Sequence, residues 1–187
     1  MTKAEIRKTA LKRRKALASE ELQSLSADLL ARFSSLDLSQ VRVIHLFLPI
    51  ASKNEPNTFL FIEWLQTNHP HIKILVPRAD FDTSLMTHHE YPGADRLIKN
   101  LYDILEPEDL QPHTGQIDMV LIPLLAFDLR GYRVGYGKGF YDRFLSGIST
   151  RKVGISLFGP EPLIENPDAL DVRMDLCLCP DQIYQFS

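Results

Sequence analysis

The chain has 187 residues, of which 44% are hydrophobic, enough to bury one substantial core but hardly two, so we expect a single domain spanning residues 1–187. Its formal net charge of −3 gives no reason to expect a nucleic acid as a partner, and no apolar run approaches the roughly 18 residues of a membrane span. The basic N-terminus lacks the apolar segment of a signal peptide, because residues 10–25 are too charged. We therefore expect a cytoplasmic protein and take it to be a monomer.

The first part of the chain has the pattern of two helices. Thr2-Lys-Ala-Glu5 has the form of a capping box, and the apolar residues that follow it recur at roughly helical spacing: Ile6, Ala10, Leu11 and Leu17. A second amphipathic helix is predicted by the apolar stripe Leu22, Leu25, Leu29, Leu30 and Phe33.

Strands and helices alternate in the rest of the chain. We expect strands at residues 41–48, 72–77, 85–91, 119–122, 152–157 and 176–179, and a helix at 58–66. A further helix should begin after a glycine-rich run and end near Gly147, and residues 106–115 should form a surface loop. This alternation predicts a layered α/β sandwich.

The glycine-rich run contains four of the nine glycines of the chain within residues 131–139. It follows an apolar, strand-like run at residues 119–126 and leads into a helix start at 140–145. Free backbone N–H groups and the helix dipole would favour an anion there, and Lys138 and Arg133 add positive charge. The run therefore predicts a phosphate-binding loop.

Two better-known nucleotide loops do not fit this run. A P-loop would need glycine and then Ser or Thr at positions that hold Tyr132 and Gly139. A dinucleotide fingerprint needs unequal spacing, whereas Gly135, Gly137 and Gly139 are spaced by two. A turn that serves only backbone geometry is the alternative. The charged residues packed around the glycines argue against it: Arg133, Lys138, Asp142 and Arg143.

The opening helix is unusually basic, with seven Lys and Arg residues against Glu5 alone: Lys3, Arg7, Lys8, Lys12, Arg13, Arg14 and Lys15. Most of these should form a solvated face. Lys3 and Arg7 differ, because side chains four residues apart reach the same side of one turn and could close on a single polyanion.

Several residues of other types are expected to be structural. Cys177 and Cys179 alternate on a predicted strand and should point to one face as small buried apolar groups, because two thiols do not supply a zinc site. His88 and His89 should point to opposite faces as ordinary polar positions. Trp64 should belong to the core rather than to a ligand site.

The glycine-rich run also carries a family resemblance. Ala126-Phe-Asp128, Gly131, Arg133 and the segment from Gly135 to Arg143 resemble the signature of the 5-formyltetrahydrofolate cyclo-ligase family. Further elements occur in the same order as in that family: Lys3 with Arg7, 54–58, 85–86, 104–107 and Asp171 with Asp175. The chain departs from the family at Tyr136, where relatives can carry Arg, and in the length of the stretch 48–55.

The resemblance implies a three-layer α/β/α sandwich that is Rossmann-like and related to sugar-isomerase and coenzyme-A-transferase folds. It also implies ATP-dependent conversion of 5-formyltetrahydrofolate into 5,10-methenyltetrahydrofolate, with release of ADP and phosphate. Since a formamide oxygen is a poor leaving group, it would be phosphorylated first, and N10 would then attack the activated carbon. Two alternatives stay open, a kinase or ligase for another amide or carboxylate and a non-catalytic nucleotide-binding protein.

Site residues follow from the same resemblance. ATP would bind Lys3, Arg7 and the run Arg133, Val134, Gly135, Tyr136, Gly137, Lys138, Gly139, Phe140 and Tyr141, with Lys138, Arg133 and Tyr141 catalytic. The folate would contact Leu48, Ile50 and Glu55 together with Tyr136, Gly137, Lys138, Gly139 and Phe140. Asp142 and Asp171 would hold Mg²⁺, which needs only one or two carboxylates beside the phosphates. Without the resemblance, Glu55 would be an exposed loop carboxylate, and each aspartate a helix cap or surface charge.

Overall fold

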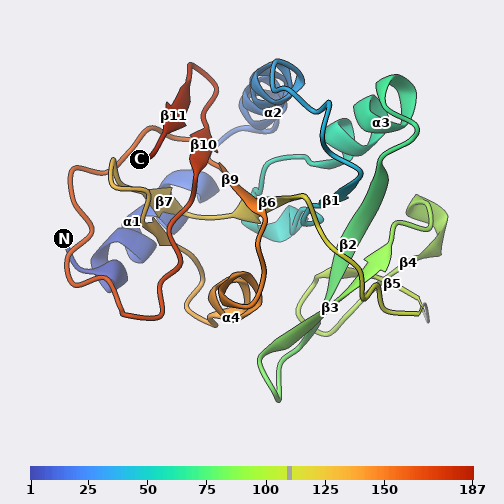
Figure 1. Cartoon of the computed structure of the whole chain (residues 1–187). Coiled ribbons are helices and arrows are strands. Elements are labelled where there is room, and N and C mark those ends of the chain that lie inside the picture. Colours follow the sequence, from blue (N-terminus) through green and yellow to red (C-terminus); the bar gives the residue numbers. More distant parts are fainter. Residues whose placement is uncertain (109–110) are drawn as a thin grey trace.

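A seven-stranded sheet forms the centre of the computed structural model, which describes residues 1–108 and 111–187 (Figure 1). The strand order is β11-β10-β9-β6-β1-β2-β3. Five neighbouring strands are parallel, and the two edge strands are antiparallel to them. The parallel strands are β10 (Leu176–Leu178), β9 (Arg151–Ile155), β6 (Met119–Pro123), β1 (Val43–His45) and β2 (Lys73–Asp80), and the edges are β11 (Ile183–Gln185) and β3 (Leu85–Glu90).

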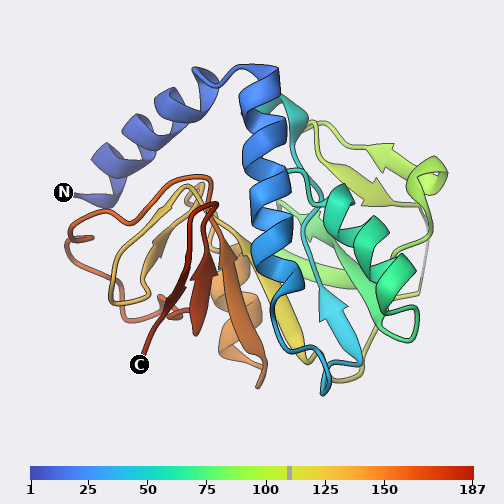
Figure 2. The ribbon, with the colours of Figure 1, turned by 90° about the horizontal axis from the view of Figure 1, so that it is seen from above.

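Helices cover both faces of this sheet, which confirms the predicted three-layer α/β/α sandwich. Helices α2 (Ser19–Ser34) and α3 (Phe59–Asn68) pack on one face, and α4 (Phe140–Ser146) packs on the other (Figures 1 and 2). Phe33 of α2 stacks on Phe61 of α3 with ring centroids 4.9 Å apart, inside the larger core cluster. Leu145 of α4 belongs to the cluster on the opposite face.

The opening helix α1 (Lys3–Lys15) begins with the predicted capping box. The Thr2 hydroxyl accepts a hydrogen bond from the Glu5 amide, and the Glu5 carboxylate accepts one from the Thr2 amide. Most cations of α1 are exposed, as expected, but Arg14 is only 2% exposed. The prediction of a solvated face is therefore wrong for Arg14.

Two boundaries differ from the predicted ones because tertiary contacts decide them. The predicted strand 41–48 is reduced to the three residues of β1, since the chain leaves the sheet to form the short helix η1 (Ala51–Lys53). The predicted surface loop 106–115 begins as a strand, because β5 (Leu105–Pro107) pairs with β4 (Leu97–Lys99) after the short helix η2 (Ala94–Arg96). Residues 109 and 110 of that loop lie outside the described residues.

The strand order reverses between β1 and β6, and we call the region between the loops that follow these two strands the crevice. The chain runs from β1 outward to β2 and then returns to β6 on the other side of β1. Loops after the carboxyl ends of two such strands diverge, and ligands of open α/β sheets bind there. The segment with Glu55 follows β1, while the hairpin β7 (Ala126–Phe127) and β8 (Arg133–Val134) and the glycine-rich loop follow β6.

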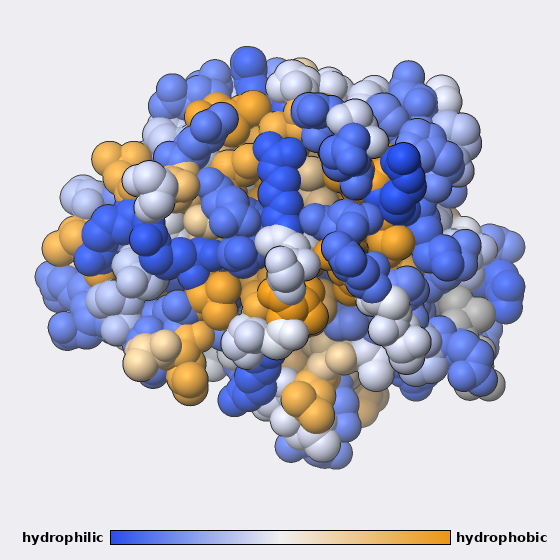
Figure 3. Space-filling view, viewed as in Figure 1, coloured by the Kyte–Doolittle hydropathy of each residue, from blue (hydrophilic) through white to orange (hydrophobic). Residues whose placement is uncertain are grey.

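The surface and the remaining core positions are ordinary. The face in Figure 3 shows small groups of hydrophobic residues among hydrophilic ones, as is usual for a folded chain. Of the helices in the described ranges, not one combines the length and the apolar character needed to cross a membrane. Cys177 and Cys179 are fully buried in one cluster, and Trp64 packs against Phe33, as predicted.

The two adjacent histidines of β3 are buried, so the interpretation of them as ordinary polar positions is wrong. His88 stacks on Phe144 of α4 with centroids 4.0 Å apart, and its edge meets the fully buried His45 of β1 at 4.8 Å. His89 shares a 2.8 Å hydrogen bond with the Thr87 hydroxyl. A histidine cluster therefore lies between the sheet and α4.

Acidification should destabilise the fold through this cluster. Burial, reinforced by His89 and His113, lowers the pKa of His88 from 6.5 to about 4, and burial also lowers the pKa of His45. Because the unfolded chain then binds more protons than the folded one, this stability is present above pH 6.5 and lost as the pH falls toward 4. From His88 alone we expect the free energy of unfolding to drop by roughly 2 kcal/mol between about pH 7 and about pH 5.

Urea unfolding of wild type and His88→Phe across this range measures the effect. The variant should lose part of the pH dependence, whereas the matched change His71→Phe, at an exposed position, should keep it. Identical pH dependence in all three proteins would contradict the role given to His88.

Candidate functional site

The glycine-rich loop between β8 and α4 has the backbone conformation of an anion cradle. Gly137 and Gly139 have φ of +90° and +70°, left-handed values that glycine adopts without strain. A Cβ atom at Gly139 would also lie 2.8 Å from Nη1 of Arg143. Gly139 is the N-cap of α4 and offers no side chain to the first amides of the helix, so these remain available to a ligand. Since α4 has only seven residues, nearby cations must supply most of the positive charge.

Helix α1 places one cation, Arg7, at the loop and a second, Lys3, at Asp171. The Arg7 Nε donates a 2.9 Å hydrogen bond to the Gly135 carbonyl, and a Cβ atom at Gly137 would lie 3.2 Å from Arg7 Nη2. The Lys3 ammonium forms a partly buried ion pair with Asp171. Both side chains of the predicted pair are partly buried. Arg7 contacts the loop directly, and Lys3 is held by the aspartate beside it.

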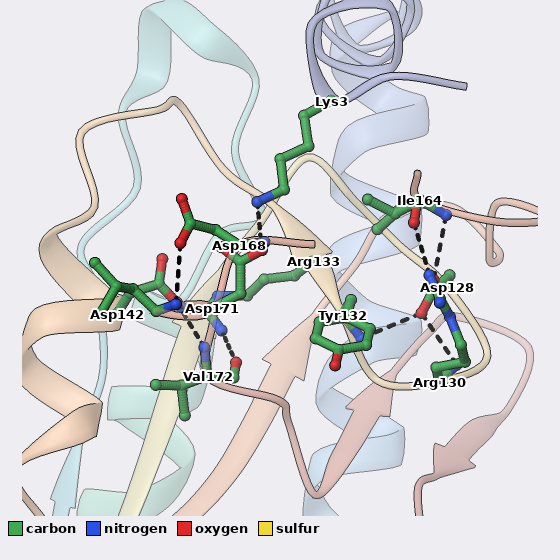
Figure 4. A network of polar contacts seen from close by, with 11 residues as sticks. Lys3, Asp128, Arg130, Tyr132, Arg133, Asp142, Ile164, Asp168, Asp171 and Val172 are labelled. Atoms are coloured by element: carbon green, nitrogen blue, oxygen red, sulfur yellow. Dashed lines mark hydrogen bonds and ion pairs between the residues drawn. The ribbon is translucent and has the colours of Figure 1, made fainter. Parts of the chain in front are cut away.

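A second group of charges surrounds the start of α4 (Figure 4). Arg133 Nη2 lies 2.7 Å from Oδ1 of Asp142, and the same oxygen accepts a hydrogen bond from the Val172 amide at 3.1 Å. The adjacent Asp171 accepts through Oδ2 from Lys3 and, at 2.7 Å, from the Asp168 amide. The two predicted metal ligands are therefore brought onto adjoining segments.

These two carboxylates fit a magnesium ion that also binds phosphate and water. Within residues 1–108 and 111–187, the hydrogen bonds of these carboxylates use Oδ1 of Asp142 and Oδ2 of Asp171, so the other oxygen of each could bind a cation. Across residues 1–108 and 111–187, no group of three or more His, Cys, Asp or Glu side chains could form a metal cage. Mg²⁺ commonly binds with few protein ligands in this way.

The turn that enters the glycine-rich loop is organised by Asp128, whose side chain is almost fully buried (Figure 4). Its carboxylate pairs with Arg130 at 2.7 Å and accepts hydrogen bonds from the amides of Arg130, Tyr132 and Ile164. A charge this well paired and hydrogen-bonded fixes the backbone around it. Asp128 thereby holds the path of the chain into β8 and the loop.

Glu55 is buried in the crevice, only 5% exposed. Its Oε2 accepts a 2.8 Å hydrogen bond from the Ile50 amide, and its Oε1 accepts one from the Tyr136 hydroxyl, also at 2.8 Å. Burial raises the pKa of Glu55, and the Ile50 hydrogen bond and the charge of Arg14 oppose that rise. The reading of Glu55 as an exposed loop carboxylate is excluded, and the segment after β1 is joined directly to the glycine-rich loop.

An aromatic group adjoins the loop from two hairpins. The rings of Phe81, between β2 and β3, and Tyr102, between β4 and β5, stack at 3.9 Å between centroids. Phe140, the first residue of α4, meets Phe81 edge-on at 5.1 Å. Tyr102 is 55% exposed, so part of this group of three aromatic rings is accessible to a ligand.

Comparison with known proteins decides between the functions that the loop allows. Residues 1–178 match the model of the 5-formyltetrahydrofolate cyclo-ligase family. The chain belongs to this family. It is 31% identical to the 5-formyltetrahydrofolate cyclo-ligase of Mycoplasma pneumoniae over 185 residues, which cover 95% of this chain and 98% of that one. It is 27% identical to the 5-formyltetrahydrofolate cyclo-ligase of Escherichia coli K12 over 150 residues, covering 76% and 80%.

Solved structures agree. The NMR structure of the Aquifex aeolicus 5,10-methenyltetrahydrofolate synthetase superposes with a TM-score of 0.76 at 27% identity, covering 99% of this chain and 93% of that one. The Mycoplasma pneumoniae 5,10-methenyltetrahydrofolate synthetase gives a TM-score of 0.72 at 26% identity, covering 96% and 99%. This family member is an ATP-dependent ligase that converts 5-formyltetrahydrofolate into 5,10-methenyltetrahydrofolate.

Of the residues expected at the site of this cyclo-ligase family member, Glu55 is hydrogen-bonded to Ile50 and Tyr136, and Arg7 to Gly135. Four other expected residues are placed in distinct ways. Lys138 is exposed at the loop, and its carbonyl accepts a 2.8 Å hydrogen bond from Arg143. Leu48 lies in the larger core cluster, and Val134 is buried against α1, so its backbone alone reaches the loop. The Tyr141 hydroxyl is buried without a hydrogen-bond partner in the described ranges, and burial raises its pKa.

Three residues at the crevice were not expected there. Phe81 and Tyr102 lie in turns, and no periodicity predicts that two turns far apart in sequence will stack. Arg14 was assigned to the solvated face of α1, although it lies seven residues after Arg7 and so shares its side of the helix. The seven-residue spacing from Arg7 was therefore the sequence signal that could have placed Arg14 at the crevice.

Proposed function

We propose that residues 1–187 act as one cyclo-ligase domain, with Mg²⁺ and ATP bound at the glycine-rich loop and 5-formyltetrahydrofolate bound beside Glu55. The hydrogen bond between Glu55 and Tyr136 carries the proposal, because it joins the segment that would hold the folate to the loop that would hold the phosphates. The partners are then small molecules, with no nucleic acid or membrane, and the working form is a monomer.

In the nucleotide half, backbone amides from Gly135 to Tyr141 bind phosphate oxygens, and cations neutralise them. Arg7 already lies against Gly137, and Arg133 is fixed by Asp142. Lys138 is the exposed cation of the loop, so its ammonium is free to reach the phosphoryl group in transfer. Phosphoryl transfer asks the protein mainly for such positioning and charge neutralisation.

Asp142 and Asp171 would hold Mg²⁺ through their remaining oxygens. When bound, the ion neutralises charge on the phosphates. The Lys3 ammonium, now paired with Asp171, is placed to move to a phosphate oxygen when the carboxylate turns to the cation.

In the folate half, a flat pterin needs apolar walls and a few fixed polar groups. Glu55 accepts hydrogen bonds from pterin N–H groups, with Ile50 beside it. The stacked rings of Phe81 and Tyr102, together with Phe140, offer the wall on the other side. Of the two aliphatic residues predicted to contact the folate, Ile50 is better placed than Leu48, which lies in the core.

The reaction then needs two displacements. The formyl oxygen attacks the terminal phosphorus of ATP and ADP leaves, so that the oxygen becomes part of a good leaving group. N10 attacks the formyl carbon, loses its proton, and expels the phosphate that carries the former formyl oxygen. Lys138 stabilises the charge of the phosphoryl group in the first displacement.

The fate of the formyl oxygen tests this sequence of steps. We expect substrate labelled with heavy oxygen in the formyl group to deliver the label into inorganic phosphate, one atom for each methenyl product, as measured by mass spectrometry. Label released into water instead would contradict phosphorylation of the formyl oxygen. Incubation of labelled substrate without ATP is the control for exchange with solvent.

A further inference from the structure

Arg14 is an arginine that the interior of the protein holds in one orientation. Its Nη2 donates to the Leu124 carbonyl just after β6, and its Nη1 donates to the Tyr136 hydroxyl at 3.0 Å. Its own carbonyl accepts a 2.9 Å hydrogen bond from the Asn54 side chain, next to Glu55. Its Nε is buried without a partner within the described residues. Burying a guanidinium is costly unless a negative charge compensates it.

The compensating charge is Glu55, reached through one hydroxyl group. Tyr136 accepts a hydrogen bond from Arg14 and donates one to Glu55 at 2.8 Å, so the three side chains form a polarised chain from cation to carboxylate. Linked hydrogen bonds of this kind strengthen one another in the protein interior, because the local dielectric constant is low. Arg14 thus acts on Glu55 without touching it.

The position of Arg14 on α1 adds a second connection. Lys3, Arg7 and Arg14 are four and seven residues apart, so they share one side of the helix. Arg7 contacts the loop at Gly135, and Arg14 contacts the next residue, Tyr136. One rigid helix therefore contacts the nucleotide cradle directly and is linked, through the Tyr136 hydroxyl, to the carboxylate of the folate pocket.

We propose that Arg14 is a positioning residue that, through the Tyr136 hydroxyl, orients Glu55 for the folate and links the folate pocket to the nucleotide side of the loop. The inference rests on the function proposed above. The cation of this link comes from helix α1, and the tyrosine hydroxyl connects it to the carboxylate.

The charges around Glu55 support this role. Burial raises the pKa of Glu55, whereas the Ile50 amide, Arg14, Tyr136 and Lys53 each lower it. The Lys53 ammonium lies over the Tyr136 ring, 4.3 Å from its centroid. Burial, followed by the charge of Glu55, raises the pKa of Tyr141 in α4, so this residue stays a neutral phenol. Loss of the Arg14 connection should therefore make Glu55 easier to protonate as well as less well oriented.

The test compares Tyr136→Phe, Arg14→Leu, Arg14→Lys and the double variant of the first two with wild type. Tyr136→Phe removes only the hydroxyl and leaves Arg14 bonded to Leu124, so it keeps the fold even if Arg14→Leu weakens it. We expect Tyr136→Phe to raise the KM for 5-formyltetrahydrofolate about tenfold, with the KM for ATP within about twofold. The acid limb of kcat/KM for the folate should move to higher pH, and Arg14→Lys should recover part of the loss.

Because Arg14 and Tyr136 act as one unit, the rise in folate KM in the double variant should be no larger than the rise in the more impaired of the two single variants. Arg13→Leu is the matched control, an exposed arginine on the same helix that lies over the Phe158 ring, and it should keep the wild-type constants. If wild type is active but the folded Tyr136→Phe variant keeps the wild-type folate KM and pH profile, this inference alone is overturned. It is also overturned if the losses of the two single variants multiply in the double variant. A wild type that does not convert the folate would overturn the proposed function, and this inference with it.

Discussion

Replacing Lys138 with alanine should lower kcat by about a hundredfold to a thousandfold. Lys138 is exposed and its backbone is held by Arg143, so its removal leaves the loop and the core intact. What is lost is the exposed ammonium that we propose stabilises the transferring phosphoryl group. Arg7 and Arg133 are fixed by Gly135 and Asp142 and have less freedom to replace it.

Steady-state kinetics at saturating ATP and folate measure this effect. Lys12→Ala, at an exposed lysine of α1 outside the site, is the matched control and should turn over as wild type does. Unfolding midpoints of both variants should equal that of wild type. A Lys138→Ala protein that retains turnover within about threefold of wild type would show that another group stabilises the phosphoryl transfer.

Replacing Glu55 with glutamine should lower kcat/KM for 5-formyltetrahydrofolate by about a hundredfold and leave the affinity for ATP unchanged. Glutamine keeps the shape of the side chain but removes the negative charge to which Arg14 is linked through Tyr136. The same charge is the one that we propose accepts hydrogen bonds from the pterin N–H groups. The NH₂ group of glutamine would also face one of the two donors that now bind the carboxylate, the Ile50 amide or the Tyr136 hydroxyl, and leave that donor without an acceptor.

Binding measured separately for each ligand, by calorimetry, distinguishes the two halves of the site. Glu63→Gln, at an exposed carboxylate of α3, is the control for the loss of one negative charge. Glu55→Gln protein that binds ATP and folate as wild type does, or that loses both equally while folded, would contradict the assignment of Glu55 to the folate pocket.

Local patterns were sufficient where short-range physics decides the structure. The capping box at Thr2 and Glu5 and the apolar stripe of α2 predicted two helices, because both features act within one or two turns. The glycine spacing predicted a phosphate loop, and the loop does have left-handed glycines with cations around it. The resemblance then supplied Glu55 and Asp171, for which the sequence alone gave only a surface interpretation.

Long-range packing explains what local patterns did not predict. Arg14 looked like one more exposed cation because its partners, Leu124 and Tyr136, lie more than a hundred residues away. His88 looked polar because nothing local indicates that Phe144 of α4 will cover it. The strand expected at 41–48 ends early because the chain leaves the sheet and turns into η1. This turn is held by the hydrogen bond from the Ile50 amide to the Glu55 carboxylate.

The central claim is that this crevice performs ATP-dependent cyclisation of the folate. The most direct measurement mixes purified protein with 5-formyltetrahydrofolate, ATP and Mg²⁺ and follows the absorbance of 5,10-methenyltetrahydrofolate together with the release of ADP. We predict that the absorbance rises only in the complete mixture, with one ADP for each product, and stops when either ATP or the metal is omitted. No rise from folded protein that binds ATP, or a rise without ATP, would contradict the account.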